Sequence, residues 1–181
     1  MKKVVILCSL FLFIMVLNGC YRAPQSPPPG PPPGPTTPFT LEIWTAKNMY
    51  RVSEKIILTV RASQECYITL YDISTTGEVI QIFPNRYASD NLIQGGYAYP
   101  IPDESDMFDL VIAGPAGVER VRAIGTVQNV NLLDNRKIDT TEDFPRILVS
   151  PEQFDKSLNE KLNTMPSDQW AEASVTFQVI E

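Results

Sequence analysis

The chain has 181 residues, with 15 Lys and Arg, 21 Asp and Glu, 16 Pro, three Cys and no His. Its hydrophobic content of 44% is enough for a core and excludes wholesale disorder, while a pI near 4.7 argues against nucleic-acid binding. The absence of histidine excludes Ser-His-Asp and Cys-His catalysis and histidine-ligated metals. We expect a non-enzymatic protein and assign no catalytic residue, no metal ligand and no cofactor.

The amino terminus has the pattern of an export signal. Two lysines precede an apolar run over residues 4–16, which is shorter than the roughly 20 residues that a bilayer span needs. The run is followed at once by a box of four residues, Leu17, Asn18, Gly19 and Cys20. We predict that residues 1–19 are a signal peptide that is cleaved immediately before the cysteine.

This start resembles the signal peptides of bacterial lipoproteins. The resemblance implies that the Cys20 thiol carries a diacylglycerol and that the new amino terminus carries a further acyl chain, such as palmitate. Several acyl chains hold a protein on a membrane far more firmly than one. Tyr21 stands where an aspartate would favour inner-membrane retention, so the resemblance favours the outer membrane. We expect a lipid-anchored, extracytoplasmic protein of the cell envelope.

The charge of the mature chain limits the ligands that it can bind. Without the two signal lysines it has 13 basic and 21 acidic residues, so we expect no binding to anionic surfaces or nucleic acid.

Cys66 has no partner for an intramolecular disulfide, because Cys8 leaves with the signal and Cys20 is lipidated. It shares a face with Ile68 and Leu70, which favours a core cysteine over a reactive thiol.

Residues 20–38 form the lipidated cysteine and a proline-rich linker. Ala23 to Pro38 reads APQSPPPGPPPGPTTP, in which prolines are too dense for a helix or a sheet. Such a segment adopts an extended polyproline arm of about 3.1 Å per residue, which lifts the next domain up to roughly 50 Å from the lipid. A plain tether is favoured over a segment that a proline-binding groove recognises.

From Phe39 onward the apolar residues recur at every second position, which is typical of β-strands. The alternating runs, in chain order, are 39–44, 56–62, 66–70, 79–83 (Val79 and Phe83, with Gln81 as a polar exception), 97–101, 108–112 and 121–127. Gly77 predicts a tight hairpin before Val79, and Gly114 to Gly117 predicts a second hairpin. About seven short strands predict a mainly β fold, an immunoglobulin-like β-sandwich over residues 39–181.

The segment 128–181 extends this sandwich by a helix and a strand. Ser150, Pro151 and Gln153 have the N-cap, first-turn proline and third-position glutamine of a helix start. Phe154, Leu158 and Leu162 then fall on one stripe, and Met165-Pro166 ends the helix. Alternating apolar residues over 173–179 predict a final strand.

A set of motifs lies between Leu41 and Val127. They are YRVSEKI at 50–56, ECYITLYDI at 65–73, GEV at 77–79, IFPN at 82–85, DN at 90–91, Gly96, YPIP at 99–102 and GPAG at 114–117. In order and spacing they resemble an uncharacterised bacterial module, the domain-of-unknown-function family 4384. Ser53 departs from the resemblance, because a glycine is expected before Glu54. The family occurs in envelope lipoproteins and has no agreed activity, so the resemblance implies fold and context.

Two acidic groups are candidate calcium or acid/base sites. They comprise Asp103, Glu104, Asp106 and Asp109, and then Asp139, Glu142 and Asp143. Neither has the alternating ligands, central glycine and distal glutamate of a hand-type calcium loop. We interpret both as solvated turns and keep weak calcium binding by the first as an alternative.

Aromatic residues supply the candidate binding surface. Tyr67 and Tyr71 lie opposite Cys66 and are expected to pack, whereas Tyr87, Tyr97 and Tyr99 border the mobile turn at Gly95-Gly96. The leading hypothesis is an interaction or adapter module that binds an unidentified envelope protein. The alternative is an envelope domain that binds glycan or peptidoglycan through these tyrosines, or senses another ligand.

Overall fold

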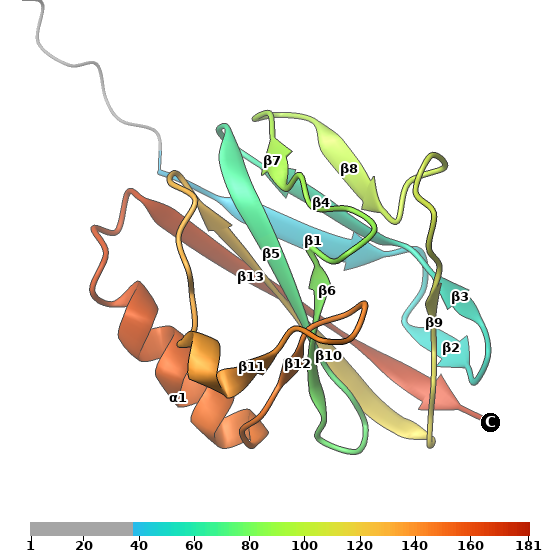
Figure 1. Ribbon diagram of the computed structural model, residues 1–181. Coiled ribbons are helices and arrows are strands. Elements are labelled where there is room, and N and C mark those ends of the chain that lie inside the picture. Colours follow the sequence, from blue (N-terminus) through green and yellow to red (C-terminus); the bar gives the residue numbers. More distant parts are fainter. Residues whose placement is uncertain (1–37) are drawn as a thin grey trace, which may run out of the picture. The chain divides into compact units, whose positions relative to one another are not determined.

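The computed structural model of the protein describes residues 38–181 (Figure 1). The predicted signal peptide, its cleavage box at Leu17 to Gly19, the lipidation site at Cys20 and the linker up to residue 37 lie outside the described residues. Among residues 38–181, no helix combines the length and the hydrophobicity that crossing a membrane requires.

The larger sheet of the domain has the strand order β11, β12, β6, β5, β10, β13 and β2, with β7 beside β5. Its strands are β2 (Met49–Arg51), β5 (Cys66–Ile73), β6 (Val79–Phe83), β7 (Leu92–Ile93), β10 (Gly117–Thr126), β11 (Ile138–Asp139), β12 (Arg146–Ile147) and β13 (Trp170–Ile180). The final strand β13 pairs antiparallel with the whole of β10 and parallel with β2. The predicted final strand is therefore an inner strand of the sheet, next to the edge strand β2.

Smaller sheets cover one face of the larger sheet, and a helix covers the other (Figure 1). The smaller elements are a sheet of β1 (Leu41–Thr45), β4 (Leu58–Ala62) and β8 (Ala98–Ile101), and a ribbon of β3 (Lys55–Ile56) and β9 (Leu110–Val111). The opposite face carries a 3₁₀ turn, η1 (Asn135–Lys137), and the helix α1 (Pro151–Leu162). The predicted mainly β sandwich with one helix and a final strand is confirmed.

Strict alternation along β5 gives the sheet two cores. Cys66, Ile68 and Leu70 are buried between the sheets, whereas Tyr71 and Ile73 are buried against the helix. Burial raises the pKa of the Cys66 thiol to about 12, and the nearby charge of Glu65 adds to the effect. The prediction of a core cysteine is confirmed, and burial keeps this thiol protonated and unreactive.

The helix starts where its capping residues predict. Ser150 is the N-cap, and its hydroxyl accepts a hydrogen bond from the Gln153 amide at 3.4 Å. Three apolar side chains of the predicted stripe are buried beneath the helix, Phe154, Leu158 and Leu162. Leu162 is the last helical residue, so the helix ends a few residues before the predicted stop at Met165-Pro166.

The first predicted hairpin is confirmed and the second is wrong. β5 and β6 pair antiparallel around Gly77, whose φ of +80° favours glycine. β9, however, pairs with β3, while β10 pairs with β5 and β13. The glycine-rich stretch 114–117 is a crossing between two layers, because the strands on either side of it belong to different sheets.

The prediction that Val79 and Phe83 share one face of β6 is wrong, because the strand contains a bulge. The register between β5 and β6 shifts between Leu70 and Tyr71. As a result Val79 lies in the core beneath the helix, whereas Phe83 lies in the core between the sheets. The two residues do not share a face, because the extra residue in the bulge reverses the alternation.

The turn after β2 explains the departure at Ser53. This residue has a φ of +69°, in the left-handed region that glycine adopts without steric strain. Its amide donates to the carbonyl of Ile112 at 2.9 Å, which ties the turn to the segment after β9. A glycine is expected here because the backbone, not the side chain, makes this turn.

Candidate functional site

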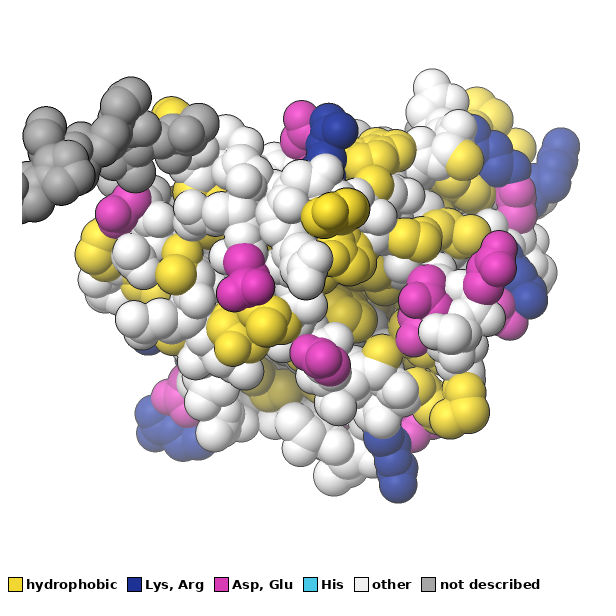
Figure 2. All heavy atoms as spheres, turned by 90° about the horizontal axis from the view of Figure 1, so that it is seen from above, with side chains coloured by type: hydrophobic (Ala, Val, Ile, Leu, Met, Phe, Trp, Pro, Cys, Tyr) yellow, Lys and Arg dark blue, Asp and Glu magenta, His cyan; other side chains and the backbone are white. Residues whose placement is uncertain are grey.

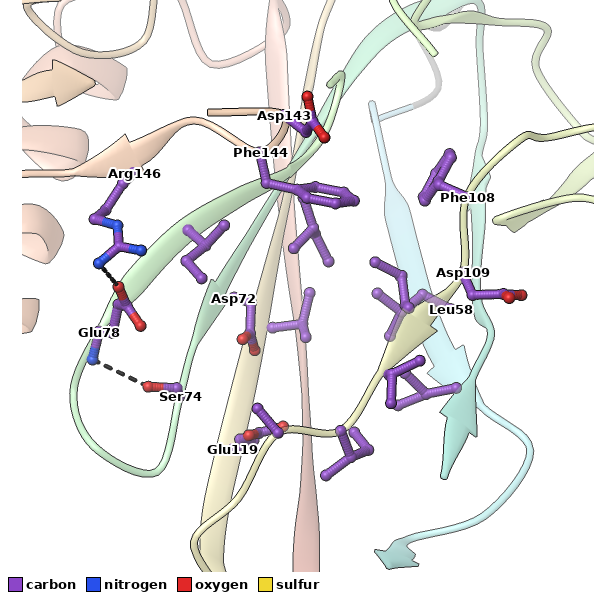
Figure 3. A pocket seen from close by; sticks show the side chains of 18 of the residues that line it. Leu58, Asp72, Ser74, Glu78, Phe108, Asp109, Glu119, Asp143, Phe144 and Arg146 are labelled. Atoms are coloured by element: carbon purple, nitrogen blue, oxygen red, sulfur yellow. Dashed lines mark hydrogen bonds and ion pairs between the residues drawn. The ribbon is translucent and has the colours of Figure 1, made fainter. Parts of the chain in front are cut away.

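A groove of about 820 Å³ opens between the larger sheet and the ribbon of β3 and β9 (Figure 3). One wall comes from β5, β6, β10 and β13, and the other from β3, β4 and the segment 107–114. Both walls are mainly apolar, and their aliphatic side chains include Ile56, Leu58, Ile80, Ile82, Leu110 and Ile112. A concave, apolar cavity of this size is typical of a ligand site.

Two carboxylates, those of Asp72 and Glu119, form the floor of this groove. Asp72 on β5 lies opposite Val121 on β10, and Glu119 lies two residues from Val121 along the same strand. Because side chains two apart on a strand share a face, both carboxylates face the groove. Figure 3 shows them across the groove from Leu58.

The floor carboxylates lack partners within the described chain. Glu119 is only 4% exposed, and no hydrogen bond or ion pair to its side chain occurs among residues 38–181. The Oδ1 atom of Asp72 is shielded from solvent and likewise has no hydrogen-bond partner in this range. Buried polar atoms in proteins are normally hydrogen-bonded, so the shielded Oδ1 of Asp72 is an exception that requires a reason.

Burial perturbs both acids, and like charge adds to the effect at Asp72. Burial raises the pKa of Asp72 to about 8, and the charges of Glu119 and Glu78 add to this effect. Burial also raises the pKa of Glu119. Each group therefore holds its proton more tightly than a solvated carboxyl, because burial desolvates its charged form.

The basic side chains near the groove form ion pairs with other acidic residues at its rim. Arg146 donates from Nη1 to Glu78 at 2.5 Å and from Nη2 to Glu142 at 3.2 Å. Lys55 pairs with Asp109 at 2.7 Å. Figure 3 shows the Arg146–Glu78 pair beside the turn between β5 and β6. None of these cations is bonded to the floor carboxylates.

An aromatic cluster of Tyr87, Phe108 and Phe144 lies at the mouth of the groove. The Tyr87 ring centroid is 6.2 Å from that of Phe108 and 6.3 Å from that of Phe144. The Tyr87 hydroxyl donates to the Asp143 carboxylate, which raises the pKa of the tyrosine. Tyr87 remains 43% exposed, so this cluster presents aromatic surface to a ligand.

The structure does not bring the three predicted tyrosines together. Tyr87 lines the groove, whereas Tyr97 and Tyr99 do not. Tyr97 is 64% exposed before β8, and the Tyr99 hydroxyl accepts a hydrogen bond from the Gln94 amide at 3.0 Å. The other predicted site residue, Cys20, lies with its cleavage box outside the described residues.

Local hydrogen bonds account for much of the two acidic loops. Asp103 accepts hydrogen bonds from the amide and hydroxyl of Ser105, which lower its pKa. Asp139 binds the amide and hydroxyl of Thr141 in the same way. This geometry agrees with the interpretation of both segments as solvated turns.

The sequence pattern contains a signal for the floor carboxylates that our prediction missed. Asp72 stands in phase with the buried Cys66, Ile68 and Leu70, and Glu119 stands in phase with Val121. A charged residue at a core position of a strand is unusual, because burial of a charge is unfavourable. That anomaly, rather than exposed aromatic residues, marks the groove.

Comparison with known proteins identifies part of the chain. Residues 49–129 match the family described as Domain of unknown function (DUF4384). The match runs from β2 to the end of β10, so it includes both floor carboxylates and excludes α1 and β13. A search of the curated proteins finds no match to the chain. The predicted presence of this domain is confirmed for the matched residues.

Proposed function

We propose that this protein is a lipid-anchored envelope lipoprotein whose sandwich domain is a non-enzymatic adapter that binds a segment of a partner protein. The groove between the larger sheet and the β3–β9 ribbon is the observation that carries the proposal. Its walls are apolar, and large apolar side chains continue onto its rim, where Met107 is 82% and Val111 is 52% exposed. Contiguous apolar surface of this kind is characteristic of interaction sites.

The anchor of the proposed adapter is Cys20. A diacylglycerol on its thiol and an acyl chain such as palmitate on its amino group would hold the protein in the outer membrane. The proline-rich linker would then carry the domain toward its partner. Replacement of Cys20 by alanine should release the protein from the membrane fraction. A Cys20→Ala protein that still pellets with membranes in high salt would contradict this anchor.

Site-specific photocrosslinking in intact cells tests the adapter function. A photoreactive amino acid at Met107 stands on the groove rim, and one at Val118 is a matched control, because Val118 is 60% exposed but does not line the groove. We expect a discrete, protease-sensitive adduct from position 107 and none from position 118. Equal adducts from both positions, or none from either, would contradict a groove that binds a partner protein.

A second candidate function is binding of glycan or peptidoglycan. The aromatic cluster at the groove mouth favours it, because the exposed ring of Tyr87 can stack on a sugar. The same adducts distinguish the two functions. An adduct from position 107 that a muramidase degrades and a protease leaves intact would favour the glycan-binding domain over the adapter.

A further inference from the structure

The floor carboxyl groups are acids that the described domain leaves without a basic partner. Glu119 is only 4% exposed, and the Oδ1 atom of Asp72 is shielded from solvent. Neither the Glu119 side chain nor this atom of Asp72 has a hydrogen-bond partner among residues 38–181. The two acids lie on adjacent strands and face the same cavity. Ionisation of both acids in this apolar setting is unfavourable, and one cation placed between the walls would stabilise their charged forms.

The rest of the groove lining has the same charge bias. Among residues 38–181, six acidic side chains line it and only Arg146 is basic, the acids being Asp72, Glu78, Asp109, Glu119, Glu142 and Asp143. Figure 2 shows one face of the domain, on which hydrophobic side chains gather in a hollow between Asp and Glu side chains. A ligand complementary to the groove therefore combines positive charge with apolar surface.

The position of the floor selects the form of that cation. Asp72 and Glu119 share the groove with aliphatic side chains of the walls, such as Leu58 and Ile82. A hydrated metal ion would gain nothing from these walls, and the described residues contain no group of three or more side chains suited to hold one. Lysine and arginine carry their charge on an apolar stem, which matches both features.

Building on the proposed adapter function, we propose that the groove recognises a basic side chain of the partner segment, whose cationic head group binds the carboxylates of Asp72 and Glu119. Apolar residues on either side of that lysine or arginine contact the walls. The partner is thus a polypeptide with a basic residue in an apolar stretch. The floor carboxylates determine specificity, and the walls supply apolar burial.

Selection from a random heptapeptide phage library tests this specificity. The bait is the full-length lipidated chain in nanodiscs, compared with the double variant Asp72→Asn/Glu119→Gln. A double variant of equal charge change, Glu104→Gln/Asp168→Asn, is the matched control, since both of its sites are exposed and outside the groove. We expect the wild type and the control to enrich peptides with Lys or Arg between apolar residues.

The affinity of one selected peptide then measures the contribution of the charge. Replacement of its basic residue by norleucine should weaken binding to the wild type by about tenfold or more, since a buried ion pair loses one member. The floor double variant should bind both peptides with similar affinity. Thermal unfolding of each variant verifies that it is folded before the affinities are compared.

The possible outcomes separate this inference from the proposed function. Apolar peptides enriched without a basic residue, or the same basic preference in the floor variant, would overturn the inference and leave the adapter intact. A library that yields no groove-dependent peptide would contradict both. If purified cell wall displaces the peptide from the wild-type groove, the natural ligand is cell-wall material. That result would overturn the proposal of a protein partner.

Discussion

The two faces of β10 differ in whether their buried charged side chains have bonding partners. On the helix side, Arg122 is 4% exposed and donates to Asp155 at 2.6 Å, Glu172 at 2.8 Å and Asn159 at 3.0 Å. On the groove side, Glu119 is equally buried and has no bonding partner in the described chain. One strand therefore carries a satisfied charge on one face and an unsatisfied charge on the other.

This difference separates a structural charge from a candidate functional one. The Arg122 network joins β10, β13 and α1, so its bonds hold the helix on the sheet. Burial alone would raise the pKa of Asp155, but the hydrogen bonds from Arg120 and Arg122 lower it. The pKa of Asp72 is instead raised to about 8. Groups that shift in this direction without a structural partner mark candidate sites.

The largest effect is expected on the helix side. Arg122→Ala removes the cation between Asp155 and Glu172 and should lower the free energy of unfolding by about 2–4 kcal/mol, since both acids stay near each other with partial access to water. Arg120→Ala, at a 37% exposed side chain, should lose at most about 1 kcal/mol. Urea unfolding at pH 7 measures both. Equal losses would contradict the structural role of Arg122.

On the groove side, we expect a substitution of Asp72 to raise the free energy of unfolding rather than lower it. Between about pH 4 and 8 the folded protein keeps a proton on Asp72 that the unfolded chain releases, so this residue lowers stability as the pH rises. Asp72→Asn removes the ionisation and should stabilise the protein by about 1–3 kcal/mol above pH 8. The difference from the wild type should shrink as the pH falls toward 4, where the unfolded chain also begins to bind the proton.

Urea midpoints of the wild type and Asp72→Asn across pH 4–9 measure this gain. Asp155→Asn is the helix-side comparison and should destabilise the protein, because its carboxylate is bonded to two arginines. A loss of stability in Asp72→Asn at high pH would show that the carboxylate has a structural partner.

A smaller, stabilising effect is expected at Ser53, which provides a reference for the effects on both faces of β10. Ser53→Gly touches neither charge cluster and relieves the positive φ of the turn after β2. We expect a gain of about 0.5–1 kcal/mol, because the steric relief exceeds the entropy that glycine adds to the unfolded chain. Thermal unfolding detects it. A Ser53→Ala change keeps the Cβ atom and should give no gain, so equal results for the two would refute strain at this turn.

The smallest effect is expected at Tyr97. This side chain is 64% exposed and does not line the groove, so Tyr97→Ala should alter stability by less than about 0.5 kcal/mol and leave ligand binding unchanged. Tyr87→Ala should weaken binding roughly tenfold, because Tyr87 lies in the aromatic cluster at the mouth. Calorimetry with a groove ligand distinguishes them. Equal losses would restore the predicted surface of all three tyrosines.

The sequence predicts those parts of the fold that depend on local pattern. Period-two alternation identifies β5 and β13, and the Ser150 cap identifies the start of α1. The partner of β9 could not be predicted, because a glycine-rich connection between two strands has the same local pattern in a hairpin and in a crossing. The bulge between β5 and β6 is equally invisible, since it depends on the register with the neighbouring strand.

The candidate site could be predicted only in part. The aromatic character of Tyr87 predicts its place in the site, but the apolar walls come from segments as distant in sequence as Ile56 and Phe177. The position of Asp72 among core residues was available in the sequence. Its significance required the three-dimensional structure, because only the packing of neighbouring elements reveals whether a buried charge has a partner.

Titration of carboxyl groups by NMR tests the difference between the two faces most directly. The protein is labelled with ¹³C at its aspartate carboxyl carbons, and Asp72→Asn and Asp155→Asn assign the two signals. We predict that Asp72 titrates near pH 8 and Asp155 below the ordinary range of an aspartate. A groove-bound basic peptide should lower the pKa of Asp72 alone. An Asp72 signal that titrates in the ordinary acidic range without a ligand would contradict a carboxyl group with a shielded, unpaired Oδ1 at the floor of the groove.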